Sequence, residues 1–557
     1  MPQSAVRTLP RWALLLLCVA YVVPGFVGRD AWKNSDVSAF GYMQELALGR
    51  TPWLAPLLAG QPPDTEGLLP YWLGAWALQA FTPWLSPEMA SRLPFALMLV
   101  LTLVATWYSA YYLARSPGAQ PVAFAFGGEA KPTDYARAMA DAGLLALFAS
   151  LGLAQFSHEI TSYLTQLTCS TLVFFAAAAL PYRTVGPLLA AVFGLFGLVL
   201  SGAPALAALL GLGGAALVLW SASDTPRPRA PWAFALLGVT LLSALLAWKL
   251  DLWRWRIVDA EGGKEWQSLM RLLLWFSWPT WPLALWTLWR WRRQLASREL
   301  HRHLLLPLWF ASVAIAATLT TQPADRALLL GLPALATLAA FALPTLSRSI
   351  SALIDWFTLI FFSASAITIW VIWLSVHTGV PAKPAANVAK LAPGFVPSFS
   401  VLAFIAALAA TAAWCALVWW RASRNRAAIW KSLVLPAGGA VLGWLLLMTL
   451  WLPLLDYGRS YGPQMRSVAQ TLGADAGCVA TYGLSRGQIA ALIHQGGVDV
   501  APGQNAPRCN WLVADATVEP PVMSVLPQGE WTQVANILRP TDKNDRLLVL
   551  RRAKPVR

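Results

Sequence analysis

The chain has 557 residues, of which 57% are hydrophobic and 12% are charged, and its formal net charge is +15. Because a soluble domain carries about 25% charged residues, this composition excludes an ordinary soluble protein. Most Lys and Arg residues lie in short loops between apolar runs, where basic residues indicate membrane orientation. We therefore expect a multi-pass membrane protein and no nucleic-acid partner.

Apolar runs recur along the chain, with roughly the 20 residues that a helix needs to cross a bilayer. Helices are expected because lipid offers no partner to open backbone groups. The thirteen predicted spans are 11–28, 91–114, 138–156, 163–181, 185–200, 204–221, 232–250, 271–289, 304–320, 327–345, 355–376, 399–420 and 430–453. The predicted fold class is mainly α, with a polytopic membrane domain at 1–454 and a small exported domain at 455–557.

Basic residues predict the orientation of these spans. If the N-terminus is cytoplasmic, the cytoplasmic loops contain the strongly basic clusters, such as Arg290, Arg292 and Arg293. The opposite loops mix basic with acidic residues. The positive-inside rule therefore predicts a cytoplasmic N-terminus and an exported C-terminus, which is periplasmic in a bacterial inner membrane.

Three exported segments are long enough to fold, namely the first loop, the segment 251–270 that mixes Trp and Arg, and the tail. The first loop, 29–90, contains amphipathic stretches at 36–48 and 69–82 that suit helices lying along the membrane interface. In the tail, β-rich runs at 477–482, 510–514 and 545–550 alternate with a helical stretch at 485–495, which predicts a small α/β domain. Cys478 and Cys509 both lie in this tail, so an oxidising compartment would allow them to form a disulfide.

Asp30 and Asp36 follow the first span at once, so the membrane surface fixes their depth. Carboxylates in such partly desolvated settings are candidates for function. Loop acids that only keep the loop hydrated are the plain alternative. Lys33 lies between the two acids and suits the same interface.

The first loop also resembles a known family. The residues that carry the resemblance are Asp36, Trp53, Pro56, Gly60, the triplet Pro70-Tyr71-Trp72, and Ala90 to Pro94. Their order is similar to the N-terminal part of the protein-mannosyltransferase and aminoarabinose-transferase glycosyltransferases of the GT-C class. The thirteen spans and the exported tail are similar to the aminoarabinose-transferase branch. The resemblance is specific over about residues 25–100.

The resemblance implies an inverting transfer of a sugar from a polyprenyl phosphate such as undecaprenyl phosphate, with Asp36 as the catalytic carboxylate. This chain departs from the family where Val37 replaces a Glu and a Lys near Glu66 is missing. Glu66, Asp30 and Asp64 are therefore candidate replacements. Asp36 and Glu66 also offer ligands for a divalent cation. No other cofactor is implied.

Further candidates bind substrate. In the first loop they are Lys33, Glu66, Tyr71 and Trp72. Outside it, Glu159 stands where the family carries a second catalytic acid, and His158 is a proton carrier, a metal ligand or only a structural hydrogen-bonding group. Guanidinium groups suit a lipid phosphate, and the candidates are Arg254, Arg256, Arg271 and Arg326. The alternative for the Trp-flanked arginines is that they anchor the chain at the interface.

The leading hypothesis is a glycosyltransferase of the bacterial inner membrane whose acceptor is lipid A or, in the alternative, a protein hydroxyl as in protein O-mannosylation. A transporter or polysaccharide polymerase is less favoured because few charges fall within the spans. A receptor or scaffold that uses the tail domain is the non-enzymatic alternative. The expected partners are the lipid-linked donor, the acceptor and membrane lipids.

Overall fold

The computed structural model describes residues 2–557 except 66, 122–129, 222–227, 254–262, 322–323, 423–427, 474–475, 502–508, 528 and 554–557. Within the described chain, six helices are long and apolar enough to cross a membrane. They are α4 (Pro87–Ala114), α7 (Ser162–Ala179), α10 (Ala230–Lys249), α14 (Arg302–Thr320), α17 (Arg348–Thr378) and α19 (Val401–Ala422). The protein is therefore a multi-pass membrane protein.

Other apolar helices are shorter or bent. The shorter ones are α1 (Arg11–Phe26), α8 (Val185–Leu200), α9 (Pro204–Trp220) and α16 (Leu332–Ala342). A bend of 70° separates α20 (Lys431–Leu447) from α21 (Leu452–Arg459), and the two make a seventh span if they are taken together. Because α21 carries Asp456 and Arg459 and clusters with the tail, we place it outside the apolar layer.

Three predicted spans are broken helices in the structure. The run 138–156 divides into α5 (Pro132–Ala149) and α6 (Leu153–Phe156), and two others divide near a proline. The run 271–289 divides into α11 (Gly263–Phe276) and α12 (Thr280–Arg290), and the run 327–345 divides into α15 (Ala324–Leu329) and α16. Pro279 and Pro333 lie at these breaks. Proline lacks the backbone N–H that a continuous helix needs, so each run ends one helix and starts another.

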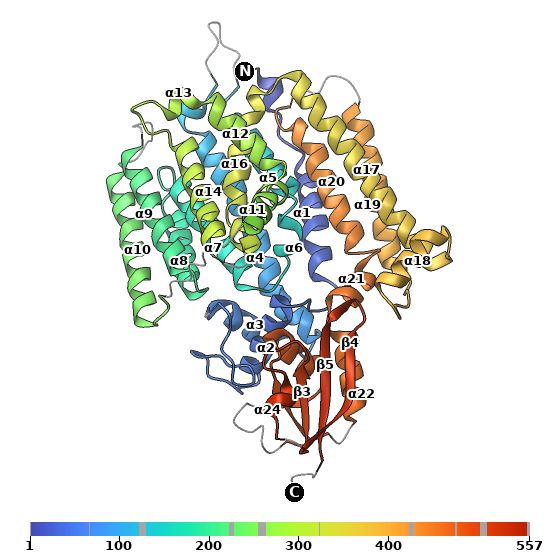
Figure 1. Cartoon of the computed structure of the whole chain (residues 1–557). Coiled ribbons are helices and arrows are strands. Elements are labelled where there is room, and N and C mark those ends of the chain that lie inside the picture. The colour runs from blue at the N-terminus through green and yellow to red at the C-terminus, as the bar shows by residue number, and fades with distance from the viewer. Residues whose placement is uncertain are drawn as a thin grey trace. The chain divides into compact units, whose positions relative to one another are not determined.

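The chain divides into two compact units, and the larger is a helical unit made of residues 1–26, 95–367 and 405–446. Its centre lies where α5 (Pro132–Ala149) packs against α16, and both helices bury nearly every side chain. Around it, α7 packs on α8, and α8, α9 and α10 stand side by side (Figure 1). A short helix, α6 (Leu153–Phe156), follows α5.

The second unit combines residues 27–94, 368–404 and 447–557, so the tail clusters with the first loop. The loop forms α2 (Ser35–Ala47) and α3 (Leu69–Phe81), close to the two predicted amphipathic helices. In this unit α2 packs against α23 (Arg486–His494) of the tail. Gly41 permits the approach, because a Cβ there would lie 2.7 Å from the Ala490 Cβ. Residues 368–404 add α18 (Ala382–Leu391).

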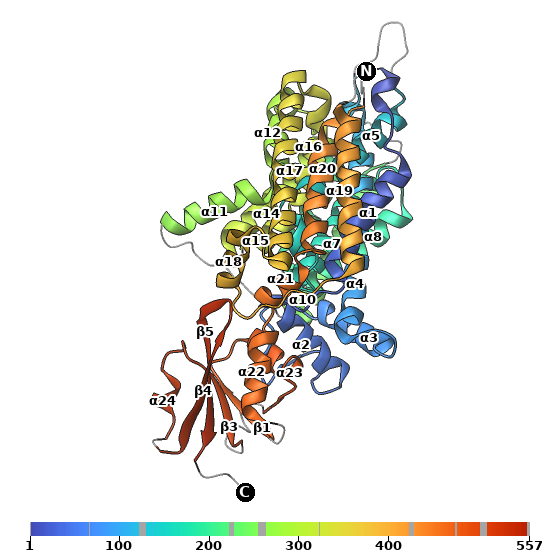
Figure 2. The same cartoon turned by 90° about the vertical axis from the view of Figure 1, so that its right-hand side faces the viewer.

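The tail folds around a five-stranded sheet in the order β2-β1-β3-β5-β4. The strands are β1 (Cys478–Tyr482), β2 (Asp499–Val500), β3 (Trp511–Asp515), β4 (Trp531–Arg539) and β5 (Asp542–Arg552). β2, β1 and β3 are parallel, whereas β3, β5 and β4 are antiparallel, with Val513 opposite Val549. Figure 2 shows α22 (Gly462–Leu472) and α23 on one side of the sheet and α24 (Val522–Val525) on the other. A disulfide joins Cys478 to Cys509.

Candidate functional site in the first loop and its partners

A buried ion pair stands at the start of the first loop. The Arg29 Nη2 lies 3.0 Å from the Asp36 Oδ2, and the two side chains are 0% and 1% exposed. The same carboxylate oxygen accepts the backbone N–H of Trp32 at 3.1 Å. Asp36 occupies the first turn of α2, where the helix dipole stabilises a negative charge. Its carboxylate is therefore held by a guanidinium, a backbone N–H and the helix end.

A second buried guanidinium belongs to the same group. Arg92, near the start of α4, is 2% exposed and interacts electrostatically with Arg29, Asp36 and Asp456. Asp36 thus interacts electrostatically with two buried cations, Arg29 and Arg92. Sequence analysis did not select Arg92 as a site residue. The available signal was a charged residue close to the apolar part of a span, which is costly unless the residue has a function.

Two carboxylates meet beside this ion pair. Asp456 of α21 accepts the Trp32 Nε1–H at 2.7 Å and the Asp30 backbone N–H at 3.2 Å through Oδ1. Burial, followed by the nearby charge of Asp30, raises the pKa of Asp456 to about 7. Asp30 itself is exposed. The arrangement places one accessible carboxylate next to a carboxyl group that titrates near neutral pH.

Trp32 holds the two parts of this assembly together. Its buried ring lies between two guanidinium groups, with Arg29 4.6 Å and Arg459 5.1 Å from the ring centroid. Sequence analysis did not select Asp456. Its signal was the same as that of Asp30, an acid directly after an apolar span.

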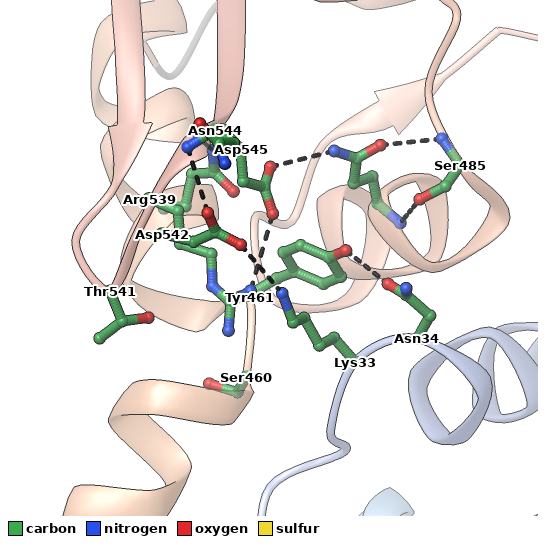
Figure 3. A network of polar contacts seen from close by, with 12 residues as sticks. Lys33, Asn34, Ser460, Tyr461, Ser485, Arg539, Thr541, Asp542, Asn544 and Asp545 are labelled. Atoms are coloured by element: carbon green, nitrogen blue, oxygen red, sulfur yellow. Dashed lines mark hydrogen bonds and ion pairs between the residues drawn. The ribbon is translucent and has the colours of Figure 1, made fainter. Parts of the chain in front are cut away.

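The tail domain fixes the loop between Trp32 and α2 (Figure 3). The Lys33 Nζ lies 3.5 Å from the Asp542 Oδ2, and the Tyr461 hydroxyl donates to the Asn34 Oδ1 at 2.6 Å. Gln488 caps α23 with Ser485 and also donates to Asp545 at 3.2 Å. The predicted substrate-binding residue Lys33 is thus paired with the tail, while remaining about one-third exposed.

Tyr71 and Trp72 lie on α3 and hold the distal part of the loop. The Trp72 Nε1–H donates to the Trp53 carbonyl at 2.7 Å. The Tyr71 ring lies 5.4 Å from the Tyr42 ring, and its hydroxyl is 3.3 Å from the Thr65 hydroxyl. Through these contacts the tryptophan and tyrosine residues of the motif hold the first loop in its fold. They do not place either ring beside Asp36.

A separate ion pair lies in the helical unit. The Arg326 Nη2 and Nε lie 2.9 and 3.2 Å from the Glu159 Oε2, and the side chains are 14% and 4% exposed. The Arg326 guanidinium also lies 5.2 Å from the Phe156 ring centroid. The structure therefore brings together two predicted site residues, one catalytic candidate and one phosphate-binding candidate.

His158 is fully buried in the same unit. Its Nε2 lies 3.1 Å from the Tyr21 carbonyl oxygen, and its Nδ1 lies 2.5 Å from the Ala154 carbonyl oxygen. The ring packs 4.7 Å from the Trp444 ring. These contacts give His158 a role in joining α1, the segment after α6, and α20.

The structure describes one of the remaining substrate-binding candidates. Arg271 is exposed on α11, and Glu66, Arg254 and Arg256 lie outside the described residues. Among the residues that the structure describes, no group of three or more His, Cys, Asp or Glu side chains is arranged to hold a metal ion.

Comparison with known proteins gives a fold but no sequence family. No family model and no curated protein sequence matches the chain. Solved structures that share its fold include ArnT from Cupriavidus metallidurans bound to undecaprenyl phosphate, with a TM-score of 0.59 and 16% identity over 98% of both chains. The apo state of ArnT gives a TM-score of 0.58 and 16% identity over 97% of this chain and 98% of that one. The predicted GT-C-like fold is confirmed.

Proposed function

We infer that this chain is a glycosyltransferase that moves a sugar from a polyprenyl phosphate, such as undecaprenyl phosphate, to an acceptor at the periplasmic face of a bacterial inner membrane. One observation carries this proposal: the exposed Asp30 and the neighbouring Asp456 lie beside the buried guanidinium groups of Arg29 and Arg92. The fold shared with a protein crystallised with undecaprenyl phosphate supports it.

The assembly offers an accessible base for an inverting transfer. A base must take the proton of the acceptor hydroxyl, and cations must stabilise the phosphate that leaves with the electron pair of the broken C1–O bond. In our proposal Asp30 is the base, because it is the accessible carboxylate. The acceptor oxygen forms the new bond to C1 from the face opposite the phosphate, which inverts the anomeric centre.

Asp36 has a positioning role in this scheme. Its contact with Arg29 is 3.0 Å and fully buried, so it holds the guanidinium in place and offsets part of the positive charge. This assignment departs from the one that the family resemblance implies. Arg326, held by Glu159, is proposed as a further cation for a lipid phosphate.

The proposed acceptor is a lipid A-type saccharide, since the resemblance in the first loop includes the aminoarabinose-transferase branch. The test reconstitutes the purified chain in nanodiscs with lipid A and undecaprenyl phosphate carrying either 4-amino-4-deoxyarabinose or mannose. Mass spectrometry should detect free undecaprenyl phosphate and lipid A heavier by one sugar. An exposed tail variant, Glu519→Gln, serves as the control and should retain full activity. Intact donors after long incubation with wild-type protein would contradict the proposal.

A further inference from the structure

A large cleft opens between the first loop and the edge of the tail sheet, within the second unit. Its volume is about 1180 Å³, and it is lined by the end of α2, the loop that follows, and residues of β1, α23 and β2. A drug-sized ligand occupies a pocket of about 300–1,000 Å³, so this cleft has room for at least a disaccharide. The chemistry assigned above does not use it.

Part of the cleft lining is polar. It presents the amides of Gln44 and Gln61, the hydroxyl of Thr481, and the carboxylates of Glu45 and Asp499. Amides, hydroxyls and carboxylates provide the mixed donors and acceptors that sugar hydroxyl groups need. Burial raises the pKa of Glu45, and the charge of Asp499 adds to that effect, which indicates that the two carboxylates influence the same space.

Other residues of the lining are apolar. Leu48 and Leu57 are 55% and 38% exposed, and Ile493 and Val498 line the cleft with them. Apolar side chains together with a few polar groups are the usual lining of a small-molecule site. Such a lining suits a sugar ring, which has C–H faces and a hydroxyl edge.

The charge of the cleft selects among saccharides. Arg50 is the only cationic residue among the described side chains that line it, and its Nη1 lies 3.5 Å from the Glu45 Oε1. Once Arg50 offsets Glu45, Asp499 leaves the cleft negative. A phosphate group would meet like charge there, and juxtaposed like charges disfavour binding.

The cleft lies at the opposite end of α2 from Asp36, the proposed positioning residue. Asp36 lies in the first turn of α2, whereas Gln44 and Glu45 lie near its end. At 1.5 Å per residue these positions are separated by about 13 Å along the helix. An acceptor of two or three sugars can span this distance, with its far end in the cleft and its reacting hydroxyl near the start of the loop.

We propose that this cleft binds the uncharged, hydroxyl-rich part of a saccharide acceptor, away from any phosphate that the acceptor carries. The proposal rests on the proposed function, because it assigns the site to the acceptor. It adds a substrate preference: a neutral disaccharide binds more tightly than the same disaccharide with a phosphate.

The test measures binding without any donor. Full-length protein in nanodiscs is titrated with N,N′-diacetylchitobiose or its 1-phosphate, and saturation-transfer NMR reports the bound sugar. Wild type should bind the neutral sugar at least about tenfold more tightly than the phosphate. Thr481→Trp, which fills the cleft, should weaken binding at least about tenfold, whereas Thr532→Trp on the exposed face of β4 should not. Asp499→Lys should reverse the preference.

Two results would overturn the proposal: equal binding by wild type and Thr481→Trp when both melt at the same temperature, or tighter binding of the phosphate by wild type. If Thr481→Trp does not fold, Gln61→Trp in the loop replaces it. The outcome is separable from that of the transfer assay. Loss of the sugar preference with intact donor turnover rejects the cleft alone, and sugar binding without donor turnover rejects the proposed function alone.

Discussion

The charge assembly of the first loop and the Glu159–Arg326 pair differ in the sign of their more exposed charged group. In the loop, the Arg29–Asp36 pair is fully buried and the accessible group beside it is the carboxylate of Asp30. In the helical unit, the buried member is Glu159 and the more exposed member is the cation Arg326. In our proposal the buried partner fixes a position in each case, and the accessible group contacts the substrate.

Asp36→Ala should have the largest effect on stability. It leaves the buried Arg29 without its ion-pair partner next to Arg92, which is also buried. Removing one member of a buried pair typically costs about 3–5 kcal/mol. We expect a clear fall in the thermal midpoint in detergent, measured by tryptophan fluorescence. Asp30→Ala is the matched control, and a similar fall in both variants would contradict the distinction drawn between the two acids.

Arg326→Gln should have the second-largest effect, which is weaker binding of the donor. Hydrogen bonds to charged groups contribute about 1.5–3 kcal/mol, so the KM for the polyprenyl phosphate donor should rise by roughly tenfold to a hundredfold. The steady-state rate over a range of donor concentrations measures this change. Arg326→Lys keeps the charge without the planar fork and should fall in between. An unchanged KM in Arg326→Gln would show that the pair is only structural.

The stability of the folded protein should depend on pH through Asp456, which lies beside Asp30 in the first-loop assembly. Its pKa is raised to about 7 in the folded protein, whereas an unfolded Asp titrates near pH 4. Between these values the folded state binds a proton that the unfolded state has lost, so its stabilising contribution is complete below about pH 4 and decreases as pH rises toward 7. Wild type minus Asp456→Asn should show this loss, at most about 1.4 kcal/mol per pH unit, in chemical unfolding. A difference that is constant with pH would contradict it.

Lys33→Met should have the smallest effect. The Lys33 and Asp542 side chains are 34% and 39% exposed and their charged atoms lie 3.5 Å apart, and exposed pairs contribute about 0–1 kcal/mol. We expect a shift in thermal midpoint within experimental scatter and little change with added salt. A loss as large as that of Asp36→Ala would mean that the tail holds the loop mainly through this contact.

Much of the fold could be predicted from the sequence because hydrophobic periodicity is a local property. The predicted helices at 36–48 and 69–82 lie within one residue of α2 and α3, and the tail strands 477–482 and 510–514 match β1 and β3. The run 271–289 is predicted as one span because most of its residues are apolar, whereas the helix breaks at Pro279. The pattern also missed β4 (Trp531–Arg539), whose residues are mostly exposed.

The site was harder to predict, because its parts come from distant segments. Asp30 and Asp456 are 426 residues apart and meet only through tertiary packing. Sequence reasoning selected Asp36 from its place in a motif, but the motif does not reveal that its carboxylate is buried against Arg29. Burial decides which acid of a loop is accessible, and burial depends on the whole fold.

The most direct test of this account is single-turnover sugar transfer in nanodiscs by wild type and Asp30→Asn, at equal bound donor and equal thermal midpoint. If Asp30 is the base, the isosteric amide should slow the chemical step by about 100-fold or more, as loss of a general base does, while donor affinity stays within a factor of about two. An Asp30→Asn variant that transfers sugar at the wild-type rate would contradict the central claim.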